Sequence, residues 1–207
     1  MTGIPQWWRS TTSIVPRLAG RPELMKTNRG DDARARAAAV VTSPQTLIGR
    51  LNAAGDLTAD EKRELAAMPL RVELLQRGQF VLRQGTRTSY CCLLVMGVLI
   101  GQRVVGSRNQ ILSFHVPGDL SGLQTLHHPI MDHDLSSAGP SAVRIVPNRF
   151  LHRVLASSRG LSHAVWRQTL VDAALQREWV ASLGSCDALA RTPNSICELA
   201  VRVEMAA

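Results

Sequence analysis

Lysine and aromatic residues are scarce in this chain of 207 residues, and its cysteines do not pair as metal ligands do. The only lysines are Lys26 and Lys62, and aromatic residues make up 4% of the sequence. Aliphatic side chains must therefore fill most of any core. The four cysteines form no CxxC pair and have no zinc-like spacing with histidine, so we expect neither a zinc site nor an iron–sulfur cluster.

Long apolar runs are also lacking. The most apolar window lies in the uncharged run 88–102, which is shorter than the ~20 residues of a membrane helix. The N-terminus has basic residues but no apolar stretch of the kind that a secretory signal contains. The sequence therefore predicts a cytoplasmic protein.

The net charge of +8 is concentrated at one end. Residues 1–42 carry seven basic and three acidic side chains, which is half of the excess, and they show no hydrophobic periodicity. We expect a disordered basic arm there, or an extended start codon. Specific DNA binding is not expected of this chain alone, because only the arm would offer a basic surface.

From Ser43 onward the sequence predicts helices and then strands. Leu47 and Leu51 indicate a first short helix, and Thr58 with Glu61 forms a capping box that starts a second. A period of two then follows, with glycines between the segments; the strands are expected around 71–74, 79–83, 91–100, 109–116 and 141–146. Many short strands with glycine turns predict an α+β chain built on an antiparallel sandwich or roll.

After Pro147 the pattern becomes helical. Apolar residues recur at three- and four-residue steps from Leu161 to Leu183, on more of the helix than one core requires. We therefore expect a helix-to-helix dimer seam, with the interface residues Leu161, Val165, Val171, Leu175 and Trp179. Pro193 is unfavourable inside a helix, so a last helix is expected to begin at or after Asn194.

Motifs of catalysis are absent. The sequence has no Gly-x-Ser-x-Gly elbow, no Walker motif and no dinucleotide fingerprint in a strand-to-helix context. We expect no enzyme and no cofactor.

The order of several segments resembles the sensor half of Crp/Fnr-type transcription regulators. These segments are RGQFVLRQG, a strand ending MGVL, NQILSFHVPGDLSGLQTL and MDHDL, followed by the helix WRQTLVDAALQREWVASLGSCDALAR and ICELAVRVE. The resemblance implies a cyclic-nucleotide-binding-like antiparallel β-roll (a jelly-roll relative) over 43–156. It also implies a dimerisation helix and a truncated hinge helix over 157–207. Family members continue with a helix-turn-helix domain, which would begin where this chain stops.

The resemblance also implies where a ligand would bind. The corresponding loop positions are Gly118, Asp119, Leu120, Ser121, Gly122, Leu123, His133 and Asp134. Leu123 takes the place of the glutamate that holds the ribose, and His133 that of the arginine that holds the phosphate. No Arg or Lys lies between Pro117 and Leu135. Because a buried phosphate needs a cationic partner, we do not expect cyclic AMP to bind.

Three functional hypotheses remain open. The chain is a signal-sensing regulator fragment that forms homodimers or mixed dimers and responds to an unknown small-molecule effector. Alternatively, it is a degenerate, ligand-free interaction domain. A third hypothesis is a cupin-like metal-dependent enzyme that uses His127, His128 and His133, although a solvated polar loop is the favoured explanation of these residues. No metal site is expected on balance, because metal ligands usually come from several strands.

Overall fold

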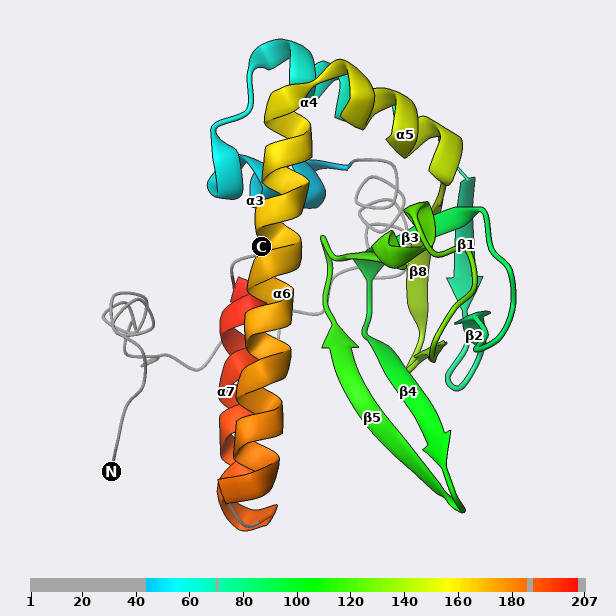
Figure 1. Cartoon of the computed structure of the whole chain (residues 1–207), viewed down its shortest axis with the longest axis vertical. Helices are drawn as coiled ribbons and strands as arrows, with labels where there is room; N and C mark the ends of the chain where they lie inside the picture. The colour runs from blue at the N-terminus through cyan, green and yellow to red at the C-terminus, as the bar shows by residue number, and fades with distance from the viewer. Residues whose placement is uncertain (1–43, 70, 186–187, 205–207) are drawn as a thin grey trace, which may run out of the picture. The chain divides into compact units, whose positions relative to one another are not determined.

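The structure, a computed structural model, describes residues 44–69, 71–185 and 188–204. The expected basic arm, residues 1–42, lies outside the described residues. The described segments form an antiparallel β-roll with helices packed around one end and along one side (Figure 1). The α+β roll that the short, glycine-punctuated strands predicted is confirmed.

Two four-stranded sheets make the roll. One has the strand order β1-β8-β3-β6 and the other β2-β7-β4-β5, and neighbouring strands are antiparallel throughout. The strands are β1 (Arg71–Leu75), β2 (Phe80–Leu82), β3 (Tyr90–Met96), β4 (Leu99–Val105), β5 (Arg108–His115), β6 (Leu120–Ser121), β7 (Asp134–Ser137) and β8 (Ser141–Pro147). Two short elements, β6 and β7, were not predicted because each is too short to show a period.

Strand β3 is buried on both faces. Cys92 and Leu94 point into the roll, whereas Cys91 and Leu93 point toward the helices. This is the two-residue alternation of a strand, and it explains why both faces are apolar. The single strand expected over 91–100 was wrong, because the chain turns at Gly97, where φ is 91°, and continues as β4 in the other sheet.

Three helices cover the end of the roll. They are α3 (Gln45–Gly55), α4 (Ala59–Ala66) and α5 (Asn148–Ser157). The capping box is confirmed: Thr58 accepts from the backbone N of Glu61, and the Glu61 carboxylate accepts from the backbone N of Thr58 at 2.8 Å. A second core forms between these helices and the outer face of β3 and β8.

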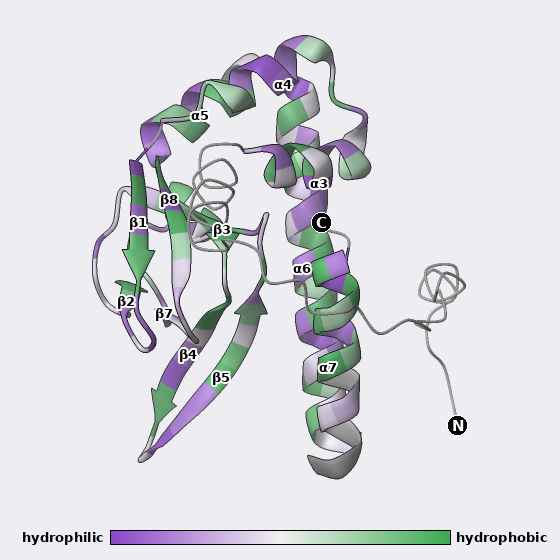
Figure 2. Ribbon diagram, turned by 180° about the vertical axis from the view of Figure 1, so that it is seen from behind, coloured by the Kyte–Doolittle hydropathy of each residue, from purple (hydrophilic) through white to green (hydrophobic). Residues whose placement is uncertain are grey.

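The last two helices lie side by side (Figures 1 and 2). Helix α6 (Arg159–Ser185) follows Ser158, whose hydroxyl accepts from the backbone N of Leu161 at 3.0 Å. Helix α7 (Ala188–Glu204) contains Pro193, so the expectation that it starts at or after Asn194 was wrong. The proline is exposed and is the sixth residue of the helix, so α7 forms despite the loss of one backbone hydrogen bond.

Among the described residues, no helix has both the length and the apolar character required to cross a membrane.

Candidate functional site

A sharp turn at 117–122 opens the loop that the resemblance marked for ligand binding. Gly118 and Gly122 have φ values of 90° and 85°, which glycine adopts at little cost. A Cβ atom on Gly118 would lie 2.9 Å from Cδ of Arg50. The glycine therefore lets α3 lie directly against the turn, which brings Arg50 to Asp119.

The far end of this loop is fixed by a buried asparagine. Residues Leu123–Leu126 form the 3-10 helix η1. Nδ2 of Asn148, the first residue of α5, donates to the carbonyl and to the hydroxyl oxygen of Thr125, both at 3.1 Å. The loop is thus held at both ends, and its middle faces the helices.

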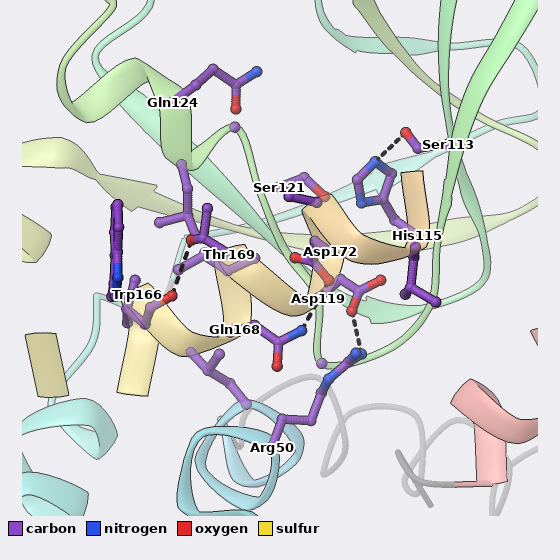
Figure 3. Close-up of a pocket in the computed structure, with 18 of the residues that line it drawn as sticks. Arg50, Ser113, His115, Asp119, Ser121, Gln124, Trp166, Gln168, Thr169 and Asp172 are labelled. Atoms are coloured by element: carbon purple, nitrogen blue, oxygen red, sulfur yellow. Dashed lines mark hydrogen bonds and ion pairs between the residues drawn. The ribbon is translucent and has the colours of Figure 1, made fainter. Parts of the chain in front are cut away.

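A cavity of about 710 Å³ lies between this loop and the helices (Figure 3). Its wall is formed by residues of the loop, β5, α3, α5, α6 and α7. Most of the wall is apolar and rich in leucine: Leu47, Leu51, Leu112, Leu120, Leu123, Leu126, Leu155 and Leu175. The volume lies within the ~300–1,000 Å³ that is usual for small-molecule sites.

Two arginines reach this wall from outside the loop. Arg50 of α3 and Arg202 of α7 both form ion pairs with Asp119, the second with an Nη2–Oδ2 distance of 2.6 Å. Arg202 also donates from Nη1 to the carbonyl oxygen of Phe114 at 3.0 Å and to Oε1 of Glu198 at 3.2 Å. The side chains of the four ionic residues are at most 13% exposed. The loop that lacks cations is therefore supplied with two by distant helices, and carboxylates neutralise both.

Helix α6 contributes a third carboxylate. Gln168 Nε2 donates to Oδ1 of Asp172 at 3.0 Å, and both residues line the cavity (Figure 3). Burial, with the nearby charge of Asp119, raises the pKa of Asp172. Among the described residues, no cationic side chain forms an ion pair with Asp172.

Strand β5 adds a neutral histidine. Ser113 Oγ and His115 Nε2 are hydrogen-bonded at 3.0 Å (Figure 3). Burial lowers the pKa of His115 to about 4, against a weaker opposing effect of Asp119. The imidazole is therefore uncharged near neutral pH. The histidine is partly buried and is hydrogen-bonded.

One buried hydroxyl group in the cavity wall has no hydrogen-bond partner among the described residues. Ser121 is 3% exposed and lines the cavity, and its Oγ has no hydrogen-bond partner within the part of the chain that the structure describes. Buried hydroxyls are nearly always hydrogen-bonded. Ser121 is paired with Cys92 across the β6–β3 ladder, so the two side chains share a face of the sheet and the hydroxyl is closed off from solvent.

Most of the residues expected at the ligand site meet at this cavity. Those that line it are Gly118, Asp119, Leu120, Ser121, Gly122, Leu123 and His133. Asp134 does not line it: its Oδ1 accepts from the backbone N of Gln84 at 2.7 Å and pairs with Arg83 at 3.7 Å. The alternation of side chains along the chain explains this, because consecutive residues entering β7 point in opposite directions.

The residues expected at the dimer seam mostly face their own chain. Leu161 is fully buried in the core beneath α3 to α5, so it offers no surface and was wrongly placed at an interface. Val165, Leu175 and Trp179 line the cavity. Of the five, only Val171 is largely exposed, at 43%. The apolar excess along α6 is therefore shared between an internal cavity and the outside.

The histidines considered as metal ligands do not converge. His127 lies edge-on to His152, with ring centroids 6.2 Å apart, and His133 Nδ1 is 2.8 Å from Oδ1 of Asp132. No group of three or more His, Cys, Asp or Glu side chains among the described residues is arranged to hold a metal ion.

Sequence reasoning missed the charged residues that come from distant helices. Arg50 lies on the helix that Leu47 and Leu51 predicted. Glu198 and Arg202 have the i,i+4 spacing of an ion pair on a helix. The spacing was a visible signal that these two share a helix face. Nothing local in the sequence shows that this face meets Asp119.

Comparison with known proteins identifies the fold. No family model and no curated protein matches the sequence, but solved structures do. FixK2 from Bradyrhizobium japonicum superposes with a TM-score of 0.58 at 19% identity, over 62% of this chain and 64% of that one. A cyclic nucleotide-binding domain from Methylobacillus flagellatus KT gives 0.55 at 15% identity, over 70% and 86%. The fold is that of a cyclic-nucleotide-binding domain.

The resemblance to Crp/Fnr-type sensor domains is thus confirmed at the level of the fold. The sensor domain of the transcriptional regulator DNR from Pseudomonas aeruginosa matches with a TM-score of 0.50 at 19% identity, over 62% of this chain and 91% of that domain. The chain spans less than two thirds of the FixK2 chain. At these identities the likeness establishes the architecture and leaves the ligand to be argued from the cavity itself.

Proposed function

We propose that this chain carries the effector-sensing domain of a signal-responsive transcription regulator of the Crp/Fnr type. The observation that carries the proposal is the cavity between the ligand loop and α6, whose wall also includes α7. A molecule in this cavity would touch the loop and both C-terminal helices. A ligand that contacts these helices differently in two conformations of the protein shifts the equilibrium between the two conformations.

Cyclic nucleotides are not the proposed effectors. A cyclic phosphate needs a cation that is free to pair with it, and both arginines in the wall already pair with carboxylates. Leu123 packs against the helix-side core and offers no acceptor for a ribose hydroxyl. His133, at the other key position, is engaged with Asp132. An added anion would also lie near Asp119 and Asp172, which disfavours it further.

Helix α7 is the part of the domain best placed to report occupancy. Trp179 donates from its indole N–H to Glu198, and its ring packs edge-to-face on Phe114 with centroids 5.7 Å apart. Arg202 anchors the same face of α7 on Asp119 in the ligand loop. A molecule that displaces either contact would change how α7 is held.

We further propose that α6 forms the dimer contact through its outer face. Four large apolar side chains of α6 that do not line the cavity are 43–68% exposed: Leu170, Val171, Val180 and Leu183. The same face would serve homodimers and mixed dimers with related regulators. It is also what favours the second candidate function, a ligand-free interaction domain.

A blocked-cavity variant tests the sensor proposal. Ala173 lines the cavity and Ala181 is exposed on the same helix. We expect thermal-shift screening of a chemically varied library to find compounds that raise the melting temperature, because binding to the folded state stabilises it. Ala173→Trp should abolish the shift, whereas Ala181→Trp should retain it. A library without hits, or hits that Ala173→Trp leaves intact, would support the ligand-free interaction domain instead.

A further inference from the structure

The buried charges in the cavity wall do not balance. Two guanidinium groups, Arg50 and Arg202, lie beside three carboxyl groups, Asp119, Glu198 and Asp172. The two arginines are engaged with the first two carboxylates, whereas the third receives a hydrogen bond from a neutral amide. Uncompensated carboxylates are costly in a mainly apolar wall.

Other ionisable groups in the wall do not offset this surplus. His115 is uncharged near neutral pH, because burial lowers its pKa to about 4. His127, His133 and His152 line the cavity from η1, from the turn before β7 and from α5, and none of them is hydrogen-bonded to Asp172. Burial, with a further contribution from the charge of Asp119, raises the pKa of Asp172; Arg202 and Arg50 lower it but form no ion pair with this carboxyl group among the described residues.

A cationic group on a bound molecule would balance the charge of Asp172, and the rest of the cavity wall indicates what else that molecule contains. Eight leucines in the wall favour a ligand whose body is mostly apolar. Figure 3 shows Asp172 of α6 beside Asp119 of the loop, within the same site.

We infer that the cavity binds an apolar molecule that carries one protonated amine, with the ammonium group paired to the carboxylate of Asp172. This inference rests on the proposed sensor function and names the chemical class of its effector. The ammonium group supplies the missing positive charge, and the apolar body covers the leucine wall. An anion of the same shape would be repelled by the carboxylate of Asp172, which has no ion-pair partner among the described residues.

A matched set of probes tests the inference by calorimetry. The probes are 2-(1-naphthyl)ethylamine, 2-(1-naphthyl)ethanol and 1-naphthylacetate, which share one apolar body and differ in charge. We expect the amine to bind about tenfold more tightly than the alcohol, since charge-assisted hydrogen bonds are the stronger ones. The acetate should bind more weakly than both.

Asp172→Asn separates the charge from the shape of the site. We expect this variant to lose about tenfold in affinity for the amine while its affinity for the alcohol changes less than about twofold. Retained alcohol binding also shows that the variant folds. Glu178→Gln, on the exposed side of the same helix, is the matched control and should bind all three probes as the parent protein does.

Proton release offers a second readout. An ammonium group beside Asp172 lowers the pKa of that carboxyl, so at a pH where the carboxyl of the free protein is partly protonated, amine binding should release protons and the heat should depend on the buffer. Asp172→Asn should abolish that dependence.

Three results would overturn the inference. If the alcohol or the acetate binds as tightly as the amine, the cavity remains a sensor site but its effector is not an amine. If Asp172→Asn leaves amine affinity unchanged, the cation lies elsewhere. If none of the three probes binds, the inference also fails, and the library screen against Ala173→Trp decides separately whether the cavity is an effector site.

Discussion

The two cores of this domain are built from similar aliphatic residues but are closed in different ways. Between the sheets, side chains such as Leu94 and Leu99 are fully buried among other aliphatic residues. On the helix side, a cavity of about 710 Å³ remains, with charged groups in its wall. The roll interior is sealed by strands that are fixed by their hydrogen-bond ladders. The helix side is closed by α6 and α7, whose contacts to the loop are partly ionic.

The difference shows where the domain has room for function. A close-packed interior transmits strain but admits no ligand. An interior that is only partly filled, and that is bounded by a fixed loop and by helices, can bind a molecule, and the positions of the helices can change on binding. On the proposed function, the close-packed roll supplies stability and the helix side binds the effector.

The largest expected effect comes from truncating a leucine in each core. Leu94→Ala should lower the free energy of unfolding by about 2–5 kcal/mol, because the removed methyl groups leave a void among fully buried neighbours. Leu123→Ala should cost about 1 kcal/mol, because the leucine already borders open space. Urea denaturation measures both. Equal losses at the two positions would mean that the cavity is as tightly packed as the roll.

A smaller effect is expected from His115 as the pH falls. Its pKa is lowered in the folded state, so the folded state resists protonation. The stabilisation is complete above the ordinary histidine pKa and is lost as the pH falls from ~6.5 toward about 4. Between pH 7 and pH 5 the parent protein should lose about 1–2 kcal/mol more than His115→Gln. Urea denaturation at the two pH values gives the difference, and parallel losses would show that this histidine is solvated when folded.

Much of the roll could be predicted from the sequence because its signals are local. The alternation around Val143 and Ile145, and the capping box of Thr58 and Glu61, each depend on residues a few positions apart. The turn at Gly97 was missed because apolar residues continue on both sides of it, so the hydrophobic pattern shows no break.

The candidate site could be predicted only in part. The loop residues from Gly118 to Leu123 were found because they form one short segment. Arg50 and Arg202 were not, because they meet Asp119 from 69 and 83 residues away along the chain. The inner and outer faces of α6 were also indistinguishable in the sequence, since a cavity and a dimer partner both select apolar side chains.

Hydrogen exchange of α7 tests most directly the claim that charges in the cavity wall hold this helix. The comparison is between the parent protein, Arg202→Met and the control Arg63→Met, which removes an exposed ion pair on α4. We expect Arg202→Met to speed exchange of the amides of 196–204 about tenfold, as loss of the contacts to Asp119 and Glu198 favours opening. Amides of β3 and β8 should be unaffected, and Arg63→Met should change neither region. Unchanged exchange in α7 would contradict the account, because the helix would then be held without the ion pairs that link it to the cavity.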